Sequence, residues 1–436
     1  MSTVREESAI PNARKFMQQV IRGSKYTFST ALADIIDNSI EANANNVWIN
    51  VDLERLDVSI CDDGKGMSES SHAESMKIAA ETRDYDDDDL GKYGTGMKAA
   101  SLSQARKLTV ATRTATSKLI SVRRIDMDHI EKTNDWSRLT LVMDETVLPA
   151  EVLSILERHS GTAVIWQDLD RIFVKNTLKA TAAREELRKQ LSLAEEHLAM
   201  TFHRFLDGKV NGRPVFNIFI NGVRVEGWDP FLIKQGLKTR SEPAAEYKIS
   251  NSKITMAGYI LPGQKEFPSD QAFKKAGGPG KWVNSQGFWV YRNNRLIRGG
   301  GWLKMRSPDP HMSLARIAVD FPSALDTVFS VDVSKSYIEL PLAVKKEFDA
   351  YVTEIIKIAK KRYGSQSSLA LANPAGLVKP DAPKRHVQRK LSAKSLADLL
   401  LQVSKATGLQ EEMKKLKLAL QEQSREIADE IGWLDE

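Results

Sequence analysis

Hydrophobic and polar residues follow a helical spacing from about Thr30, in the segment ALADIIDNSIEA (31–42). At about 3.6 residues per turn, the hydrophobic residues of this segment share one helix face and the polar residues share the other. The hydrophobic residues are Leu32, Ile35, Ile36 and Ile40, and the polar residues are Asp34, Asp37, Asn38 and Glu41. The run VSIC (58–61) then predicts a strand that leads into the glycine turn DDGKGM (62–67). A second glycine string, LGKYGTGMKAAS (90–101), precedes a predicted helix that begins near Met97. This alternation of helix, strand and glycine turn indicates an α/β fold.

The pattern continues with a predicted strand at residues 161–166 and a long predicted helix at 178–206. Residues 214–340 contain further strand-like runs, among them 215–220 and 287–291, with the turn signals Asn221-Gly222 and Arg292-Asn293-Asn294. A closing helix is predicted from Pro341 to Lys361. We therefore predict a first domain at residues 1–178 and a second α/β domain at 179–364.

The C-terminal part of the chain differs in composition and in hydrophobic periodicity. Residues 365–390 collect Ser, Pro, Ala and basic residues without periodicity, which predicts a linker. Residues 391–436 are predicted to form a short helical or coiled-coil segment, because hydrophobic residues recur there at near-heptad spacing. These residues are Leu409, Met413, Leu416, Leu420, Ile427, Ile431 and Leu434.

Composition narrows the class of protein. Of the 436 residues, 42% are hydrophobic and 28% are charged, and uninterrupted apolar stretches stay shorter than a membrane span, so we expect a soluble protein without a membrane partner. The N-terminal sequence lacks the apolar core of a signal peptide, and the single cysteine, Cys61, agrees with a reducing compartment. The expected location is cytoplasmic, or nuclear in a eukaryote. The excess of Lys and Arg, 63 − 57 = 6, permits nucleic-acid contact without requiring it.

The polar face of the first predicted helix offers a carboxylate and an amide. Asp34 and Asn38 lie one turn apart and can point at one site. An ordinary solvated helix face explains the same residues. In the functional interpretation, Asp34 is a base that polarises a water molecule, and the amide oxygen of Asn38 binds Mg²⁺. One protein oxygen is enough, because Mg²⁺ keeps several waters and phosphate oxygens around it.

The turn DDGKGM offers the features of a base-binding site. An ionised Asp62 only accepts hydrogen bonds, as an adenine amino group requires, and Gly64 and Gly66 let the backbone approach a flat base. A simple Asp-Gly turn is the alternative.

The glycine string offers the features of a phosphate site. Gly91, Gly94 and Gly96 precede a predicted helix start, and Lys98 follows closely. Taken alone, such a string is a weak signal. It lacks the GKS or GKT ending of a P-loop and the strand-to-glycine spacing of a dinucleotide fold.

In this order, ALADIIDNS, DDGKGM, LGKYGTGMK and Gly161-Thr162 resemble the four nucleotide-binding boxes of the GHKL ATPases of the gyrase, heat-shock-chaperone and MutL type. The resemblance implies an α+β two-layer sandwich, the Bergerat fold, that binds ATP and Mg²⁺. It implies that Asn38 holds Mg²⁺, Asp62 binds adenine and Thr162 supports Asp62 through a water. It also implies a base-lining set and a phosphate-binding set. These are Gly64, Gly66 and Met67 for the base, and Gly91, Tyr93, Gly94, Thr95, Gly96, Met97 and Lys98 for the phosphates.

Within this superfamily the chain is most similar to MORC ATPases and their bacterial relatives. The similarity rests on the acidic segment that runs into the glycine box, TRDYDDDDLGKYGTGMKAASLSQARKLTVATR (82–113). FWVYRNNRLIRGGGW (288–302) and VFSVDVSKSYIELP (328–341) resemble parts of the ribosomal-protein-like α/β transducer domain. The resemblance makes Lys335 the candidate for the lysine that reaches the terminal phosphate. An exposed loop lysine is the alternative.

Asp34 departs from the family pattern, because most hydrolytic members carry glutamate there. The shorter side chain sets the carboxylate back by roughly one carbon–carbon bond, and about 1 Å of misplacement lowers rate. We therefore expect a slow ATPase that closes as a homodimer. The alternative is a non-hydrolysing, ATP-gated scaffold or chaperone-like module for a protein partner.

The predicted linker carries a basic run that offers a DNA contact, Lys379–Lys390. It contains Lys379, Lys384, Arg385, Arg389 and Lys390, and a solvated linker is the alternative. The helical C-terminal segment is a candidate docking site for a protein partner.

Overall fold

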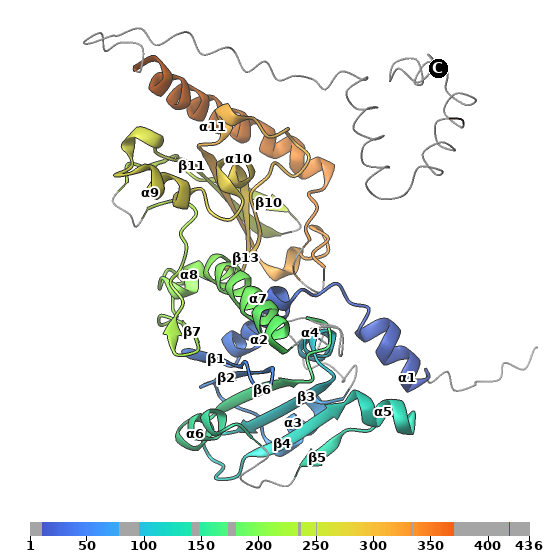
Figure 1. Ribbon diagram of the computed structural model, residues 1–436. Coiled ribbons are helices and arrows are strands. Elements are labelled where there is room, and N and C mark those ends of the chain that lie inside the picture. Colours follow the sequence, from blue (N-terminus) through green and yellow to red (C-terminus); the bar gives the residue numbers. More distant parts are fainter. Residues whose placement is uncertain are drawn as a thin grey trace, which may run out of the picture. The chain divides into compact units, whose positions relative to one another are not determined.

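The computed structural model describes residues 11–77, 96–141, 148–172, 180–233, 237–249, 251–332, 335, 337–369 and 418. The chain divides into two compact units, Met1–Ala370 and Leu371–Glu436. The first unit contains two β-sheets with helices packed on them (Figure 1). Mixed sheets and helices of this kind confirm the predicted α/β class.

The first sheet has eight strands in the order β5-β4-β3-β6-β2-β1-β7-β8. Strands β1 and β7 pair in parallel, and the other neighbours pair antiparallel. The strands are β1 (Asn46–Asp52), β2 (Asp57–Asp62), β3 (Lys107–Arg113), β4 (Ser121–Asp126), β5 (Leu139–Leu141), β6 (Gly161–Gln167), β7 (Asn217–Ile220) and β8 (Val223–Arg224).

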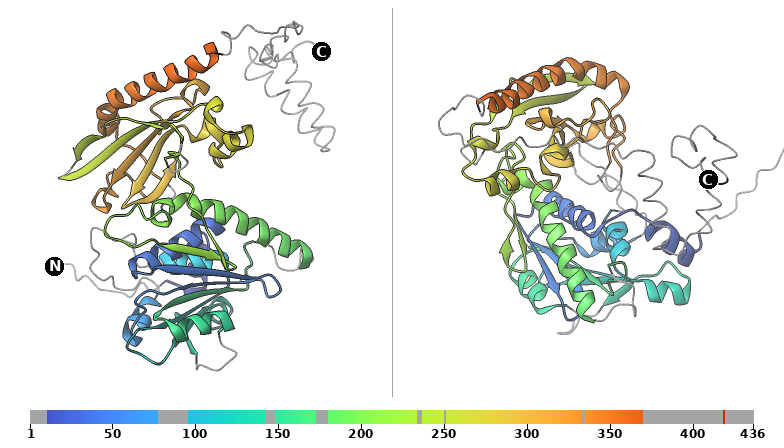
Figure 2. Two further views of the ribbon diagram at one scale, coloured as in Figure 1. Left: turned by 90° about the vertical axis from the view of Figure 1, so that its left-hand side faces the viewer. Right: turned by 45° about the horizontal axis from the view of Figure 1, so that its top comes forward.

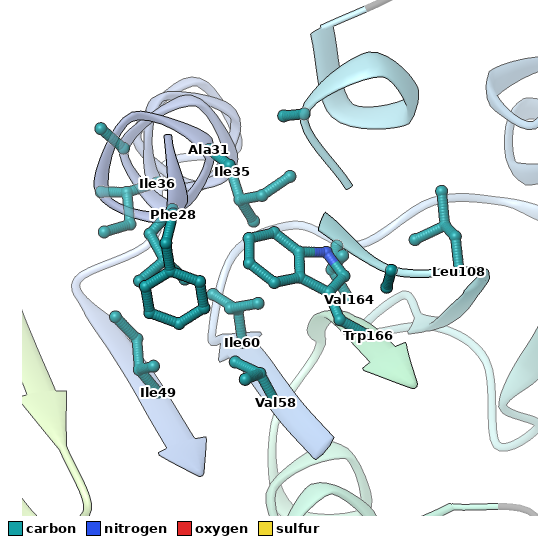
Figure 3. Packing of buried hydrophobic residues seen from close by; sticks show 14 of the residues in the cluster. Phe28, Ala31, Ile35, Ile36, Ile49, Val58, Ile60, Leu108, Val164 and Trp166 are labelled. Atoms are coloured by element: carbon teal, nitrogen blue, oxygen red, sulfur yellow. The ribbon is translucent and has the colours of Figure 1, made fainter. Parts of the chain in front are cut away.

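Helices cover the two faces of this sheet because its central strands are hydrophobic on both sides. Helices α2 (Phe28–Glu41), α4 (Gly96–Gln104) and α7 (Ala180–Thr201) contribute to the larger core cluster, and α6 (Ala150–Arg158) contributes to a second one. In β2, Ile60 belongs to the first cluster and its neighbour Cys61 to the second, as expected for alternating side chains. Figure 3 shows residues of α2 packed over Ile60 and Trp166.

Helix α2 begins where the sequence supplies a cap. Thr27 and Thr30 form a capping box, and the predicted helix is confirmed as Phe28–Glu41. A solvated polar face, the alternative considered for this helix, is wrong for two of its residues: Asp34 is 4% exposed and Asp37 is fully buried. Their burial reflects charged partners far away in the sequence, which helical periodicity cannot reveal.

The second sheet contains β10, β11, β14, β12 and β13 in that order, with β9 paired to β11. Its strands are β9 (Arg240–Ser241), β10 (Ala245–Ile249), β11 (Ser252–Ile260), β12 (Gly287–Arg292), β13 (Arg295–Gly299) and β14 (Ala315–Phe321). The predicted turn at Asn293-Asn294 is confirmed as a tight hairpin, because both residues have the positive φ values, 46° and 68°, of a type I′ turn.

One face of the second sheet is covered by α11 (Leu342–Leu369), as Figure 2 shows. Val344, Phe348, Val352, Ile355 and Ala359 recur at helical spacing and lie in the core cluster of this sheet. The helix predicted from Pro341 is therefore confirmed, and it continues past Lys361 into the first residues of the predicted linker.

The remaining helical segments are short. They are α1 (Ala13–Phe16), the π-helix Met17–Ile21, α3 (Glu69–Ser75), α5 (Met127–Thr133), α8 (His203–Leu206), α9 (Asp270–Ala276), α10 (Lys281–Ser285) and the 3₁₀ turns Gln264–Glu266, Pro310–Met312 and Ser323–Leu325. None of the helices in the described ranges is long and apolar enough to cross a membrane. The basic run Lys379–Lys390 and the predicted helical tail lie outside the described residues, apart from Leu418.

The predicted boundary between residues 178 and 179 precedes the change from one hydrophobic core to the next. Leu187, Ala194 and Leu198 of α7 belong to the core of the first sheet, and β7 pairs with β1. This core continues to Val225, and the core of the second sheet begins at Leu232. As a statement about functional domains, the division into an ATP-binding domain and a transducer domain stays a prediction.

Trp166 provides a test of the first core, because it is fully buried and meets the ring of Phe28 edge-on, with ring centroids 5.9 Å apart. We expect Trp166→Ala to lower the free energy of unfolding by about 3–5 kcal/mol, since a large buried ring is lost and a cavity remains. Denaturant unfolding followed by circular dichroism measures the change. The control is Trp136→Ala, which removes a half-buried ring and should cost clearly less. Equal losses in the two variants would contradict this account of the core.

Candidate functional site

Asp62 ends strand β2 and lies in a buried, hydrogen-bonded position. Its Oδ2 accepts a hydrogen bond from the Ser39 hydroxyl at 3.0 Å, and its Oδ1 accepts bonds from the backbone N–H groups of Gly64 at 2.9 Å and Thr162 at 3.2 Å. Burial raises the pKa of Asp62 to about 6, while the three hydrogen bonds oppose the rise. Asp62 is therefore mainly ionised at neutral pH, with its carboxylate held in one orientation.

Two glycines let the chain close around Asp62. Gly66 has φ +65°, and a Cβ atom there would lie 2.1 Å from the carbonyl oxygen of Arg113. Gly161, at the start of β6, has φ +156°, and its Cβ atom would lie 1.9 Å from the carbonyl oxygen of Asp62. Side chains at these positions would push apart β2, β3 and β6, so glycine is required at both.

A threonine pair connects the turn after β2 to the neighbouring strands. The backbone N–H of Met67 donates to Thr112 Oγ1 at 2.9 Å, and Thr112 Oγ1 lies 3.1 Å from Thr162 Oγ1. Thr112 also donates to the carbonyl oxygen of Gly161. These bonds fix the turn carrying Gly64, Gly66 and Met67 against Thr162.

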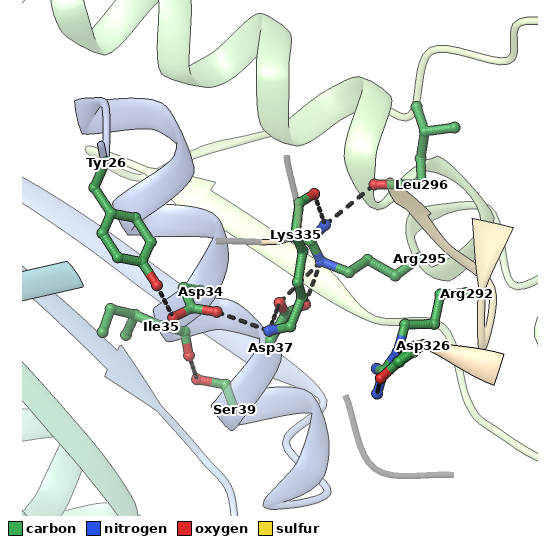
Figure 4. Close-up of polar contacts among 10 residues, drawn as sticks. All are labelled: Tyr26, Asp34, Ile35, Asp37, Ser39, Arg292, Arg295, Leu296, Asp326 and Lys335. Atoms are coloured by element: carbon green, nitrogen blue, oxygen red, sulfur yellow. Dashed lines mark hydrogen bonds and ion pairs between the residues drawn. The ribbon is translucent and has the colours of Figure 1, made fainter. Parts of the chain in front are cut away.

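The second part of the candidate site is a buried cluster of charges on α2 (Figure 4). Lys335 Nζ lies 2.7 Å from Asp34 Oδ1 and 2.7 Å from Asp37 Oδ2. Arg295, the first residue of β13, directs its Nε at both oxygens of Asp37, at 2.9 and 2.8 Å. The hydroxyl of Tyr26 donates to Asp34 Oδ2 at 3.0 Å. We call Asp34, Asp37, Arg295 and Lys335 the charge cluster.

The charge cluster contains two carboxylates and two cations. Burial by itself would lower the pKa of Lys335, but Asp34 and Asp37 outweigh it and raise the pKa, so the lysine stays protonated. Burial and the charge of Asp34 raise the pKa of Tyr26 well above its usual range, which keeps its hydroxyl a hydrogen-bond donor. His197 on α7 faces the cluster as a neutral ring at pH 7, because burial and Arg295 lower its pKa to about 4.

Of the glycine string at residues 90–101, which we call the glycine box, the structure describes only the part from Gly96 onward. Gly96 begins α4 beside Asp34, and a Cβ atom on Gly96 would lie 2.6 Å from Asp34 Oδ2. Met97 packs against the core of the first sheet. Lys98 is buried, its Nζ donates to the carbonyl oxygen of Ser75 at 2.7 Å, and burial lowers its pKa to about 8. Gly91, Tyr93, Gly94 and Thr95 lie outside the described residues.

The structure thus gathers the described candidate residues at two places along α2. Asp62, Gly64, Gly66, Met67 and Thr162 meet near Ser39, and Asp34, Gly96 and Lys335 meet one and a half turns earlier. Asn38 is exposed on the same helix.

Four residues of the site were not predicted from the sequence: Ser39, Thr112, Tyr26 and Arg295. A serine among the hydrophobic residues of α2 was a usable signal for Ser39, because a buried hydroxyl needs a partner. A cation within the hydrophobic hairpin β12–β13 was the signal for Arg295. The sequence holds no comparable signal for Thr112 or Tyr26.

Comparison with protein families matches one part of the chain, which contains Tyr26, Ser39 and Thr112 but not Arg295. Residues 26–162 match the family model described as Histidine kinase-, DNA gyrase B-, and HSP90-like ATPase. This segment is therefore similar to GHKL-type ATPase domains. The match includes Asp34 and Asp62, covers less than half of the chain, and supports ATP binding. A comparison with curated proteins gave no match.

Asp62 has remaining capacity to accept a hydrogen bond on one of its two oxygens. Asp62 Oδ2 accepts one hydrogen bond, from Ser39, and an ionised carboxylate oxygen has the capacity for another. Oδ1 accepts two backbone hydrogen bonds, so Oδ2 is the oxygen with more capacity for a further donor.

Replacing Asp62 tests this arrangement. Asp62→Asn should abolish detectable binding of adenine nucleotides, because it removes a charge-assisted hydrogen bond worth about 1.5–3 kcal/mol and presents an amide to neighbouring donors. Calorimetric titration with ADP measures the loss. The matched control is Asp63→Asn, since Asp63 accepts bonds from Asn45 and Asn46 instead. Wild-type affinity in Asp62→Asn, or equal losses in both variants, would remove Asp62 from the site.

Proposed function

We propose that the chain is a slow ATPase that couples ATP binding and hydrolysis to closure of a homodimer. In this proposal Asp62 binds adenine with help from Thr162, and Gly64, Gly66 and Met67 line the base. The glycine box from Gly91 to Lys98 encloses the phosphates. The GHKL-type domain at residues 26–162 supports the ATP-binding part of the proposal.

Magnesium would be held mainly by the phosphates and by water, with Asn38 as the protein ligand. Asn38 fits this role because it is exposed one helical turn after Asp34. A single amide oxygen suits Mg²⁺, which retains most of its waters. The ion would neutralise phosphate charge, while Asp34 orients the attacking water and takes up its proton.

The contact between Lys335 and Asp34 is the observation that carries the hydrolytic part of the proposal. It joins the GHKL domain to a residue 301 positions away in the sequence, in the segment that resembles a transducer domain. Lys335 and Tyr26 each bind one oxygen of Asp34, so in this proposal Asp34 takes hold of the attacking water only after Lys335 leaves it. The terminal phosphate of ATP is the acceptor that draws Lys335 away, and there the lysine offsets charge that develops during hydrolysis.

The alternative is a non-hydrolysing module in which ATP only gates the binding of a partner. The aspartate at position 34, where hydrolytic relatives carry glutamate, favours this alternative. Steady release of phosphate would support the ATPase, and tight ATP binding without turnover would support the gated module. Closeness to MORC ATPases, a DNA contact at Lys379–Lys390 and a protein partner at the C-terminal segment are finer parts of the proposal that await their own tests.

Asp34→Ala separates binding from hydrolysis. We expect ATP affinity close to wild type and a loss of turnover of about 10²–10⁴-fold, because a general base acts mainly in the transition state. The isosteric variant Asp34→Asn should behave in the same way, since it keeps the shape of the side chain and removes the base. Phosphate release and nucleotide titration measure the two quantities. Unchanged turnover would mean that another group activates the water, and Asp37 would be examined first.

A further inference from the structure

The two carboxylates of the charge cluster are paired unequally. Asp37 is bound by two cations, Lys335 and Arg295, whereas Asp34 is bound by one cation and by the neutral hydroxyl of Tyr26. Both carboxylates are almost completely buried. Departure of Lys335 therefore leaves Asp37 paired with Arg295 and removes the counter-ion of Asp34 alone.

This inequality decides how costly the departure of Lys335 is. A buried carboxylate without a counter-ion is strongly destabilising, because it has lost its hydration and gains no compensating charge. With Arg295 present, only Asp34 loses its counter-ion when Lys335 leaves. Without Arg295, Lys335 would be the shared counter-ion of both, and its departure would leave both unpaired.

We propose that Arg295 is a positioning residue that makes Lys335 transferable from the two aspartates to the terminal phosphate of ATP. It acts by keeping Asp37 neutralised when the lysine leaves. The inference rests on the proposed function, in which Lys335 serves the terminal phosphate, and adds the residue that sets how readily the lysine gets there.

The surroundings of Arg295 hold its guanidinium in place. Arg295 follows the tight turn between β12 and β13, its side chain is 3% exposed, and its Nη1 donates to the carbonyl oxygen of Leu296 at 3.2 Å. The ring of Phe202 lies 5.9 Å from the guanidinium carbon. A fixed arginine can keep its bonds to Asp37 while a neighbouring lysine moves.

The backbone of Lys335, in contrast, has a conformation that residues other than glycine seldom adopt. Its φ is +51°, in the left-handed region, which is unfavourable for a residue with a Cβ atom. Its backbone N–H donates to the carbonyl oxygen of Asp332 at 2.9 Å, and its side chain binds Asp34 and Asp37. The flexible four-carbon side chain of lysine, unlike the fixed guanidinium of Arg295, can turn to a new acceptor.

The test compares the affinities for a non-hydrolysable ATP analogue and for ADP. The ratio of the two reports the contribution of the terminal phosphate, and a general defect in folding or in adenine binding leaves this ratio unchanged. Arg295→Gln should lower the ratio by about 10- to 100-fold, the range of one charge-assisted hydrogen bond, because Lys335 stays on the aspartates. The same substitution in a Lys335→Ala background should have no further effect on the ratio.

Arg292→Gln is the matched control. Arg292 is the last residue of β12 in the same hairpin, is equally buried, and binds Asp326 through two bonds of 2.7 and 2.9 Å. Its loss breaks a buried Arg–Asp pair away from Lys335, so stability should fall while the ratio stays at the wild-type value. Arg295→Lys, which retains the charge, should recover most of the ratio.

Asp37→Asn extends the test with an effect of opposite sign and replaces Arg295→Gln if that variant fails to fold. It removes one acceptor of Lys335 and leaves Arg295 to repel the lysine, so the ratio should equal or exceed that of the wild type. A fall in the ratio for Asp37→Asn would overturn the inference. So would a wild-type ratio in Arg295→Gln, or equal falls in Arg295→Gln and Arg292→Gln. Failure of the wild-type protein to bind either nucleotide would overturn the proposed function itself.

Discussion

The pairing of two buried aspartates on α2 with two cations from distant parts of the sequence is the constraint on which the candidate site depends. Asp37 and Arg295 are 258 residues apart, and Asp34 and Lys335 are 301 apart. An unpaired charge at any of these positions would cost several kcal/mol. Helix α2 can therefore bury Asp34 and Asp37 only when the hairpin β12–β13 and the segment with Lys335 lie against it. Removal of one charge from this cluster therefore changes the pairing of the other three.

Helix α2 also connects the charge cluster to the adenine-binding part of the proposed site. Ser39 binds Asp62, and Asp34 binds Lys335, so residues five positions apart on one helix serve the two ends. At about 1.5 Å per residue, they are separated by roughly 7.5 Å along the axis. A single well-packed helix sets this separation, because its hydrophobic face is fixed on the first sheet by Ile36 and Ile40. Movement of α2 would shift both ends together.

Local patterns predicted elements of the fold and the glycine turn after Asp62, because hydrophobic periodicity and glycine turns depend on neighbouring residues. Helix α2, strands β2 and β6 and the Asn293-Asn294 turn all follow such patterns. The link between Asp62 and Thr162, 100 residues apart, was implied by family resemblance. The burial of Asp37 and its pairing with Arg295 could not be predicted, since both depend on contacts between distant segments. The parallel pairing of β7 with β1 is of the same kind. The roles of Asp34 and Asn38 were inferred from their shared helix face and from family resemblance. That of Lys335 came from the resemblance alone, and all three stay predictions.

The central claim is that ATP moves Lys335 from Asp34 to the terminal phosphate while Arg295 stays on Asp37. A crystal structure of the full chain with a non-hydrolysable ATP analogue and Mg²⁺ tests it most directly. The account predicts Lys335 Nζ within hydrogen-bonding distance of the terminal phosphate, Asp34 freed of the lysine, and the Arg295–Asp37 pair unchanged. A nucleotide bound beside Asp62 with Lys335 still on Asp34 and Asp37 would contradict it.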